Sequence, residues 1–167
     1  MITLKDLIAT SANTIKIDWA NVEKTIGFVI HSDLKNFYSR LICEKQRNIS
    51  GDFILKETDF IHKTGNERFD TWFSFNECEG ELGYELFPIK NIEKADIEIE
   101  KAFTDWTGGN DFGHRGLIGT IETNMGEFLI LFNNDTGNIE WIDCGYGYFE
   151  IYEKNPNGII ANSITEL

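Results

Sequence analysis

The feature that most constrains the fold is a series of short apolar segments in the last third of the chain, separated by turn-forming residues. Residues 117–121 and 127–132 are rich in Leu, Ile and Phe, and Asn-Met-Gly lies between them at 124–126. Residues 139–143 follow after the turn Asn-Asn-Asp-Thr-Gly-Asn at 133–138, whose glycine can take a positive φ. This pattern predicts an antiparallel meander, around which the rest of the fold must be built.

The first 45 residues have helical periodicity instead. Thr3 with Asp6 predicts the start of a short first helix. Asp18 is expected to cap a second helix, which Gly27 ends. Ser32 is expected to cap a third helix. The apolar residues of that third helix recur at helical spacing: Leu34, Phe37, Tyr38, Leu41 and Ile42.

The middle of the chain mixes both periods. Residues 53–55 form a short apolar run, 69–75 alternate like a strand, and 76–85 are acidic and predict a loop or a hairpin turn. Residues 91–106 fit a helix better than a strand, and Asn162 is expected to cap a short final helix. We therefore predict one α+β domain over residues 1–167, with N-terminal helices packed on a mainly antiparallel sheet, a further helix in the middle and a short C-terminal helix.

The charge of the chain is strongly negative and unevenly placed. There are 28 Asp and Glu against 15 Lys and Arg, a net charge of −13, and all of the excess follows Asn76. Such a chain is a poor partner for nucleic acid or an anionic membrane, since phosphate binding needs a basic surface. Two interpretations stay open: acidity that only maintains solubility, or an acidic surface that docks a basic protein.

The cysteines and the apolar runs indicate the compartment. Cys43, Cys78 and Cys144 are far apart and form no CxxC pair, which argues against a disulfide scaffold or a structural zinc site. The first residues lack the apolar stretch of a signal peptide, and the longest apolar run, 128–132, is too short to span a bilayer. We expect a cytoplasmic protein without a cofactor.

Two glycine-containing loops weakly resemble ligand-binding motifs. Gly108 and Gly113 have the spacing of a phosphate-binding loop, but His114 and Arg115 stand where such a loop has Lys and Ser or Thr. Residues 133–137 follow the start of a calcium loop, whose last ligand position would then be a cysteine. We therefore interpret the first as a surface contact loop and the second as a hairpin turn.

Candidate catalytic groups are scattered. The histidines His31, His62 and His114 have no neighbouring partner, and Cys144 has no basic residue beside it to lower its pKa. Four acids could be drawn as hydrolytic pairs, although a solvated face explains them more simply. These acids are Glu122, Glu127, Glu140 and Asp143. None of these residues forms a recognisable catalytic motif, although a site could still assemble from distant positions.

Two stretches resemble the SUKH superfamily, which contains bacterial immunity proteins and fungal regulators of cell-wall synthesis. The first has the family's opening Trp, Val-Glu and Ile-Gly at 18–27 and its Asp-Leu-Lys-x-Phe helix at 32–38. The second runs through 118–143 and ends in Ile-Ala-x-Ser at 160–163. Where the family has Leu-Pro before the third helix, this chain has Ile-His, and residues 45–115 match no part of the family pattern.

The resemblance implies a non-enzymatic α+β domain that, in bacteria, commonly neutralises a cognate toxin, often a nuclease. We therefore predict an immunity protein whose acidic surface binds a basic nuclease-type toxin, with no direct contact to nucleic acid or membrane. The alternatives are a regulatory protein-interaction module similar to the fungal relatives, or a hydrolase built around His114 with Asp111 or Asp143. The predicted partner-binding residues are loop acids with two aromatic anchors: Glu77, Glu79, Glu81, Asp105, Asp111, Asp135, Asp143, Trp106 and Phe112. The other tryptophans, Trp19, Trp72 and Trp141, are expected in the core.

Overall fold

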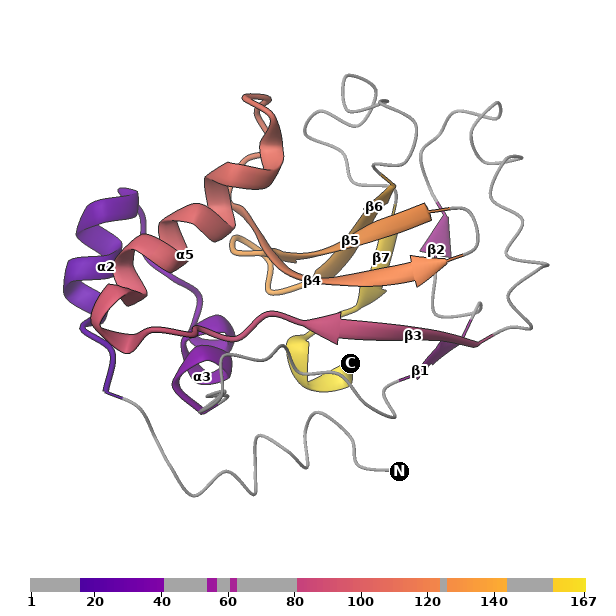
Figure 1. Cartoon of the computed structure of the whole chain (residues 1–167), viewed down its shortest axis with the longest axis horizontal. Helices are drawn as coiled ribbons and strands as arrows, with labels where there is room; N and C mark the ends of the chain where they lie inside the picture. Colours follow the sequence, from indigo (N-terminus) through magenta and orange to yellow (C-terminus); the bar gives the residue numbers. More distant parts are fainter. Residues whose placement is uncertain (1–15, 41–53, 57–60, 63–80, 124–125, 144–157) are drawn as a thin grey trace.

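The fold is α+β, with helices packed on an antiparallel sheet (Figure 1). The structure is a computed structural model that describes residues 16–40, 54–56, 61–62, 81–123, 126–143 and 158–167. The strands are β1 (Ile54–Lys56), β2 (Ile61–His62), β3 (Glu81–Leu86), β4 (Arg115–Thr123), β5 (Gly126–Asn133), β6 (Ile139–Asp143) and β7 (Gly158–Ala161). Within these residues the strand order is β1-β3-β4-β5-β6-β7-β2, and every neighbouring pair is antiparallel.

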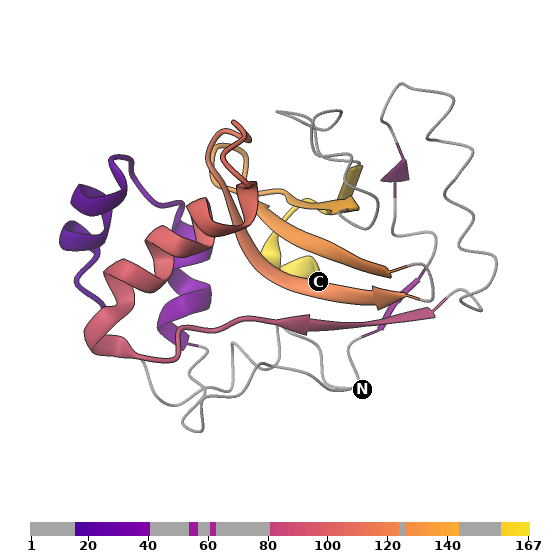
Figure 2. The ribbon, with the colours of Figure 1, turned by 45° about the horizontal axis from the view of Figure 1, so that its top comes forward.

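The helices are α2 (Trp19–Ile26), α3 (Ser32–Arg40) and α5 (Ala95–Thr104), with short 3-10 turns η3 (Ile92–Lys94), η4 (Asp105–Thr107) and η5 (Ile164–Glu166). Figure 2 shows α2 and α5 side by side at one end of the sheet. Among the described residues, no helix is long and apolar enough to cross a membrane.

The predicted meander is confirmed as β4, β5 and β6, and Gly137 in the β5–β6 turn has φ +80°. A bulge interrupts the β4–β5 register between Leu117 and Gly119. Residue 119 must be a glycine. A Cβ at this position would lie 2.2 Å from the carbonyl oxygen of Glu85 on β3, so the two strands can approach this closely only where β4 has no side chain.

The second helix begins and ends as predicted, but the predicted cap of the third is wrong. The Asp18 carboxylate accepts a hydrogen bond from the Asn21 amide, and Gly27 ends α2 in the left-handed conformation. Ser32 is the first residue of α3 and does not cap it. His31 does: its carbonyl accepts from the Lys35 amide, and its Nδ1 accepts from the Asp33 amide at 3.2 Å. A ring nitrogen thus replaces the hydroxyl that the sequence suggested.

The middle of the chain contains one confirmed helix and one unexpected strand. The helix predicted over 91–106 is present as η3, α5 and η4 in succession. The acidic loop or hairpin turn predicted for residues 76–85 is wrong for residues 81–85, the part that the structure describes. These residues belong to β3, which pairs with β1 and β4. The short apolar run at 53–55 overlaps β1, which begins at Ile54. The predicted strand 69–75 and the first helix lie outside the described residues.

The C-terminal turn η5 is present, but Asn162 does not cap it. Ser163 occupies the cap position without a side-chain hydrogen bond. Glu166 instead reaches back and accepts from the Asn162 backbone amide at 3.0 Å and from its side chain at 3.3 Å.

The core lies mainly between the helices and one face of the sheet. Trp141 is fully buried there, as predicted, and Trp19 is partly buried against the same cluster. Trp72 lies outside the described residues. The opposite face carries a smaller cluster of three buried side chains, Phe112, Leu131 and Ile142, on which Trp106 packs. The loop after α5 therefore folds over the second face of the sheet.

Candidate functional site

Three loops meet at one end of the sheet, and we call this region the loop corner. It consists of residues 28–31 between α2 and α3, residues 105–114 between α5 and β4, and residues 133–138 between β5 and β6. Figures 1 and 2 both place the α5–β4 loop beside the β5–β6 turn. The loop corner contains three aspartates and two histidines but no lysine or arginine.

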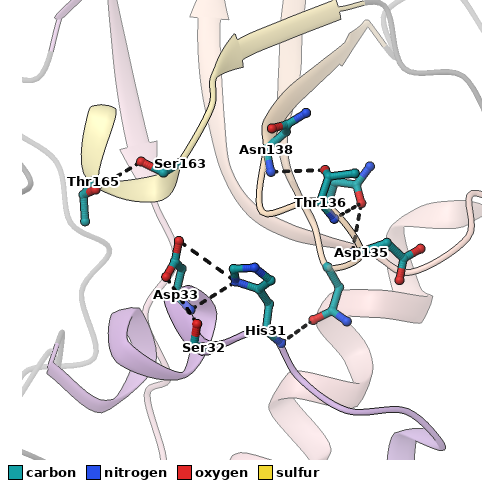
Figure 3. A network of polar contacts seen from close by, with 10 residues as sticks. His31, Ser32, Asp33, Asp135, Thr136, Asn138, Ser163 and Thr165 are labelled. Atoms are coloured by element: carbon teal, nitrogen blue, oxygen red, sulfur yellow. Dashed lines mark hydrogen bonds and ion pairs between the residues drawn. The ribbon is translucent and has the colours of Figure 1, made fainter.

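Asn134 holds the three loops together. Its Oδ1 accepts from the His31 amide at 2.8 Å, and its Nδ2 donates to the Val29 carbonyl at 2.9 Å. Its own backbone amide donates to the His114 carbonyl at 2.9 Å. The side chain is almost fully buried, so this one asparagine joins segments separated by about a hundred residues of sequence. Figure 3 shows the bond to His31.

The neighbouring Asn133 fixes the turn itself. Its Oδ1 accepts from the backbone amides of Asp135 and Thr136 at 3.0 and 3.2 Å, and its Nδ2 donates to Glu140 Oε1 at 2.8 Å. The glycine of the turn is constrained by its neighbour as well as by its φ, because a Cβ on Gly137 would lie 3.1 Å from the His31 ring. The β5–β6 turn is therefore built to fit against the start of α3 (Figure 3).

A largely buried ion pair, Arg115–Glu140, ties the α5–β4 loop to the sheet. Arg115 Nε donates to Glu140 Oε2, and Arg115 Nη1 donates to the Phe112 carbonyl at 2.8 Å. Glu140 is only 6% exposed. The prediction that Glu140 belongs to a solvated acidic face is therefore wrong, because its two carboxylate oxygens accept hydrogen bonds from Arg115 and Asn133.

The α2–α3 linker is tied to both of its helices. Glu23 Oε1 accepts from the Ile30 amide at 3.0 Å and from the Lys35 ammonium. The hydrogen bond from Lys35, followed by the Ile30 amide and the charge of Lys35, lowers the pKa of Glu23 although partial burial opposes the shift. The carboxylate is therefore held in its charged form against the linker.

The outer surface of the loop corner carries an exposed histidine–aspartate pair. His114 Nδ1 lies 2.9 Å from Asp135 Oδ1, and the two side chains are 48% and 63% exposed. The His114 ring stacks on Phe28 with ring centroids 4.2 Å apart. Val29 follows Phe28 in sequence and is 72% exposed, and its backbone carbonyl accepts from the buried Asn134 side chain. This surface is thus ordered, partly apolar and negatively charged.

Three of the predicted partner-binding acids gather at this corner. Asp105, Asp111 and Asp135 are all exposed there. Glu81 begins β3 and Asp143 ends β6, so both lie toward the other end of the sheet. Glu77 and Glu79 lie outside the described residues.

The predicted aromatic anchors are corrected by the packing. Phe112 is buried against Leu131 and Ile142 and cannot contact a partner, because the loop that carries it folds onto the sheet. Trp106 is partly buried on Phe112, with ring centroids 4.6 Å apart, and its indole N–H has no hydrogen-bond partner in the described part of the chain. Phe28 is also only partly buried, with its ring between those of Phe103 and His114.

The structure pairs His114 with Asp135, a residue that neither form of the hydrolase alternative named. Asp111 accepts from the Gly113 amide at 3.0 Å, which shapes its own loop. Within the described ranges, no three His, Cys, Asp or Glu side chains are grouped so that they could hold a metal ion. Compared with protein-family models, curated proteins and solved structures, the chain matches none of them.

Proposed function

We propose that this chain is an immunity protein that binds and neutralises a cognate bacterial toxin, with a basic, nuclease-type toxin as the partner. The resemblance to the SUKH superfamily supports this class of function. The two stretches that carry the resemblance, 18–38 and 118–143, meet at the loop corner through the hydrogen bonds of Asn134.

The observation that carries the proposal is the group of exposed carboxylates on an ordered support. Asp105, Asp111 and Asp135 are exposed on loops that buried asparagines and the Arg115–Glu140 pair tie to the core. A nuclease binds phosphates through a basic cleft, so a surface of this charge attracts the same cleft. Because the loops are held in place before binding, little ordering entropy is lost on association.

The exposed apolar side chain at the corner complements these charges. Val29 follows Phe28, whose ring stacks on His114, and its side chain is exposed. Protein interfaces combine an apolar centre with a polar rim, and the charged rim mainly governs the association rate. We expect Val29 to lie near the centre of the contact and the aspartates around it.

The test is a binding measurement between the purified chain and the toxin-like protein encoded beside its gene. We expect a complex at micromolar concentration or tighter. In the double variant Asp111→Asn with Asp135→Asn, the association rate at low salt should fall about fivefold or more, and the difference should shrink at high salt.

The matched control is Glu93→Gln with Glu127→Gln, which removes the same charge from exposed positions. Glu93 lies in η3, before α5, and Glu127 near the start of β5, whereas the loop corner lies at the other ends of α5 and β5. The control should change the association rate less than twofold at the same salt. Absence of a complex would refute the function, whereas equal effects of the two double variants would refute the loop corner as the interface.

A further inference from the structure

A second site, independent of the proposed function, lies between α3, α5 and the sheet. A cavity of about 290 Å³ opens there, with apolar walls from residues 87–89, Ala102 and Leu117. We propose that this cavity binds a small organic monoanion, a carboxylate attached to an apolar body of about one ring.

The hydroxyl of Tyr38 is the first reason. Tyr38 lines the cavity and is only 3% exposed, yet its hydroxyl has no hydrogen-bond partner among the residues that the structure describes. Burial, and secondarily the charge of Glu98, raises the pKa of Tyr38, so the hydroxyl stays protonated and can donate. Among the described residues, the hydroxyl oxygen is not one of the fully buried polar atoms that lack a partner, so it stays open to the cavity and can donate to a bound acceptor.

The charge around the cavity is the second reason. Lys90 and Lys101 also line it, and in the described part of the chain neither ammonium has a carboxylate within 4.0 Å. The one carboxylate in the lining, Glu98, already accepts from the backbone amides of Lys90 and Asn91 at 2.8 and 3.0 Å. Two lysines and one glutamate leave a local charge of +1 in a chain of −13.

The size and the walls define the rest of the ligand. Small-molecule sites are mostly apolar, with a few polar groups that fix orientation, and their volumes begin near 300 Å³. This cavity lies at that lower limit, which suits a phenylalkanoate better than a nucleotide or a sugar phosphate. The aromatic body would pack on the apolar walls while the carboxylate meets Lys90, Lys101 and the Tyr38 hydroxyl.

The test is calorimetric titration of the whole chain with 3-phenylpropionate and with its neutral amide, 3-phenylpropanamide. We expect saturable binding of the carboxylate at millimolar concentration or below, and about tenfold weaker binding of the amide. Tyr38→Phe should weaken carboxylate binding about fivefold, because one hydrogen bond is lost. Lys101→Met should weaken it to a similar extent, and Ala102→Leu should abolish it by filling the cavity.

Lys94→Met is the matched control for charge, since Lys94 is exposed on η3 and does not line the cavity. It should leave the affinity unchanged within twofold. Thermal unfolding of each variant establishes that it is folded before titration. The proposal is overturned if the carboxylate does not bind, if the amide binds equally well, if Lys94→Met weakens binding as much as Lys101→Met, or if folded Tyr38→Phe and Ala102→Leu bind like the unaltered chain.

Discussion

Replacing Asn134 by alanine tests whether one buried amide holds the loop corner together. The substitution removes the acceptor of the His31 amide and the donor to the Val29 carbonyl. The backbone bond from residue 134 to the His114 carbonyl is kept. Each lost hydrogen bond contributes about 1 kcal/mol net, and a partly buried amide left without a partner adds to the loss, so we expect the free energy of unfolding to fall by about 2–3 kcal/mol.

The assay is urea unfolding at neutral pH. With an m-value of about 2 kcal/mol/M, this loss lowers the unfolding midpoint by roughly 1–1.5 M. Asn138→Ala is the matched control, because Asn138 lies in the same loop and its side chain forms no hydrogen bond in the described part of the chain. We expect it to cost about 0.5 kcal/mol or less. Asn134→Asp keeps the acceptor and loses the donor, so its cost should lie between the two.

Amide hydrogen exchange supplies a local readout of the same bridge. The His31 amide should exchange faster in Asn134→Ala than in Asn138→Ala, since it loses its acceptor only in the first variant. Equal stabilities of the two variants, or unchanged protection of the His31 amide, would refute the reasoning that Asn134 joins the loops.

Three further substitutions test the packing by the same unfolding assay. Gly119→Ala should cost about 3 kcal/mol or more, because its Cβ meets a backbone carbonyl at 2.2 Å, whereas Gly109→Ala, with φ +88° but open space, should cost about 1 kcal/mol. Arg115→Met should cost about 3–5 kcal/mol by leaving a buried carboxylate unpaired; a cost below 1 kcal/mol would contradict this. The bond from Lys35 lowers the pKa of Glu23 below 4.5, so ionised Glu23 stabilises the fold above that pH and its contribution is lost as the pH falls through the lowered pKa. Glu23→Gln should therefore be less stable than the unaltered chain at pH 7 and equal to it in strong acid; a pH-independent difference would exclude this linkage.

The elements that could be predicted are those whose cause is local in sequence. Asp18 and Gly27 set the limits of α2 because a cap and a left-handed residue act on adjacent backbone. The β5–β6 turn follows in the same way from its own asparagines and Gly137. The strand β3 carried a usable signal as well, since Leu, Tyr and Leu alternate at 82, 84 and 86. The acidic composition of the segment outweighed that alternation in our prediction.

The arrangement of the candidate site could not be predicted, because its contacts join distant segments. No local pattern states that Asn134 accepts from His31 across 103 residues, or that His31 and not Ser32 caps α3. Phe112 looked like an exposed anchor because its loop is rich in glycine and polar residues. Its burial depends on Leu131 and on the way η4 turns the chain back over the sheet.

The loop corner assigns stability and charge to different residues. Its order comes from neutral amides and one buried ion pair, all shielded from solvent. The exposed His114–Asp135 pair contributes little to folding, because an open ion pair of this kind contributes at most about 1 kcal/mol. Asp135 can therefore be changed without unfolding the loop that presents it, whereas Asp111 also accepts from the Gly113 amide of its own loop. A surface of this kind can change its charges while the support beneath it stays the same, as the proposed binding of a cognate toxin would require.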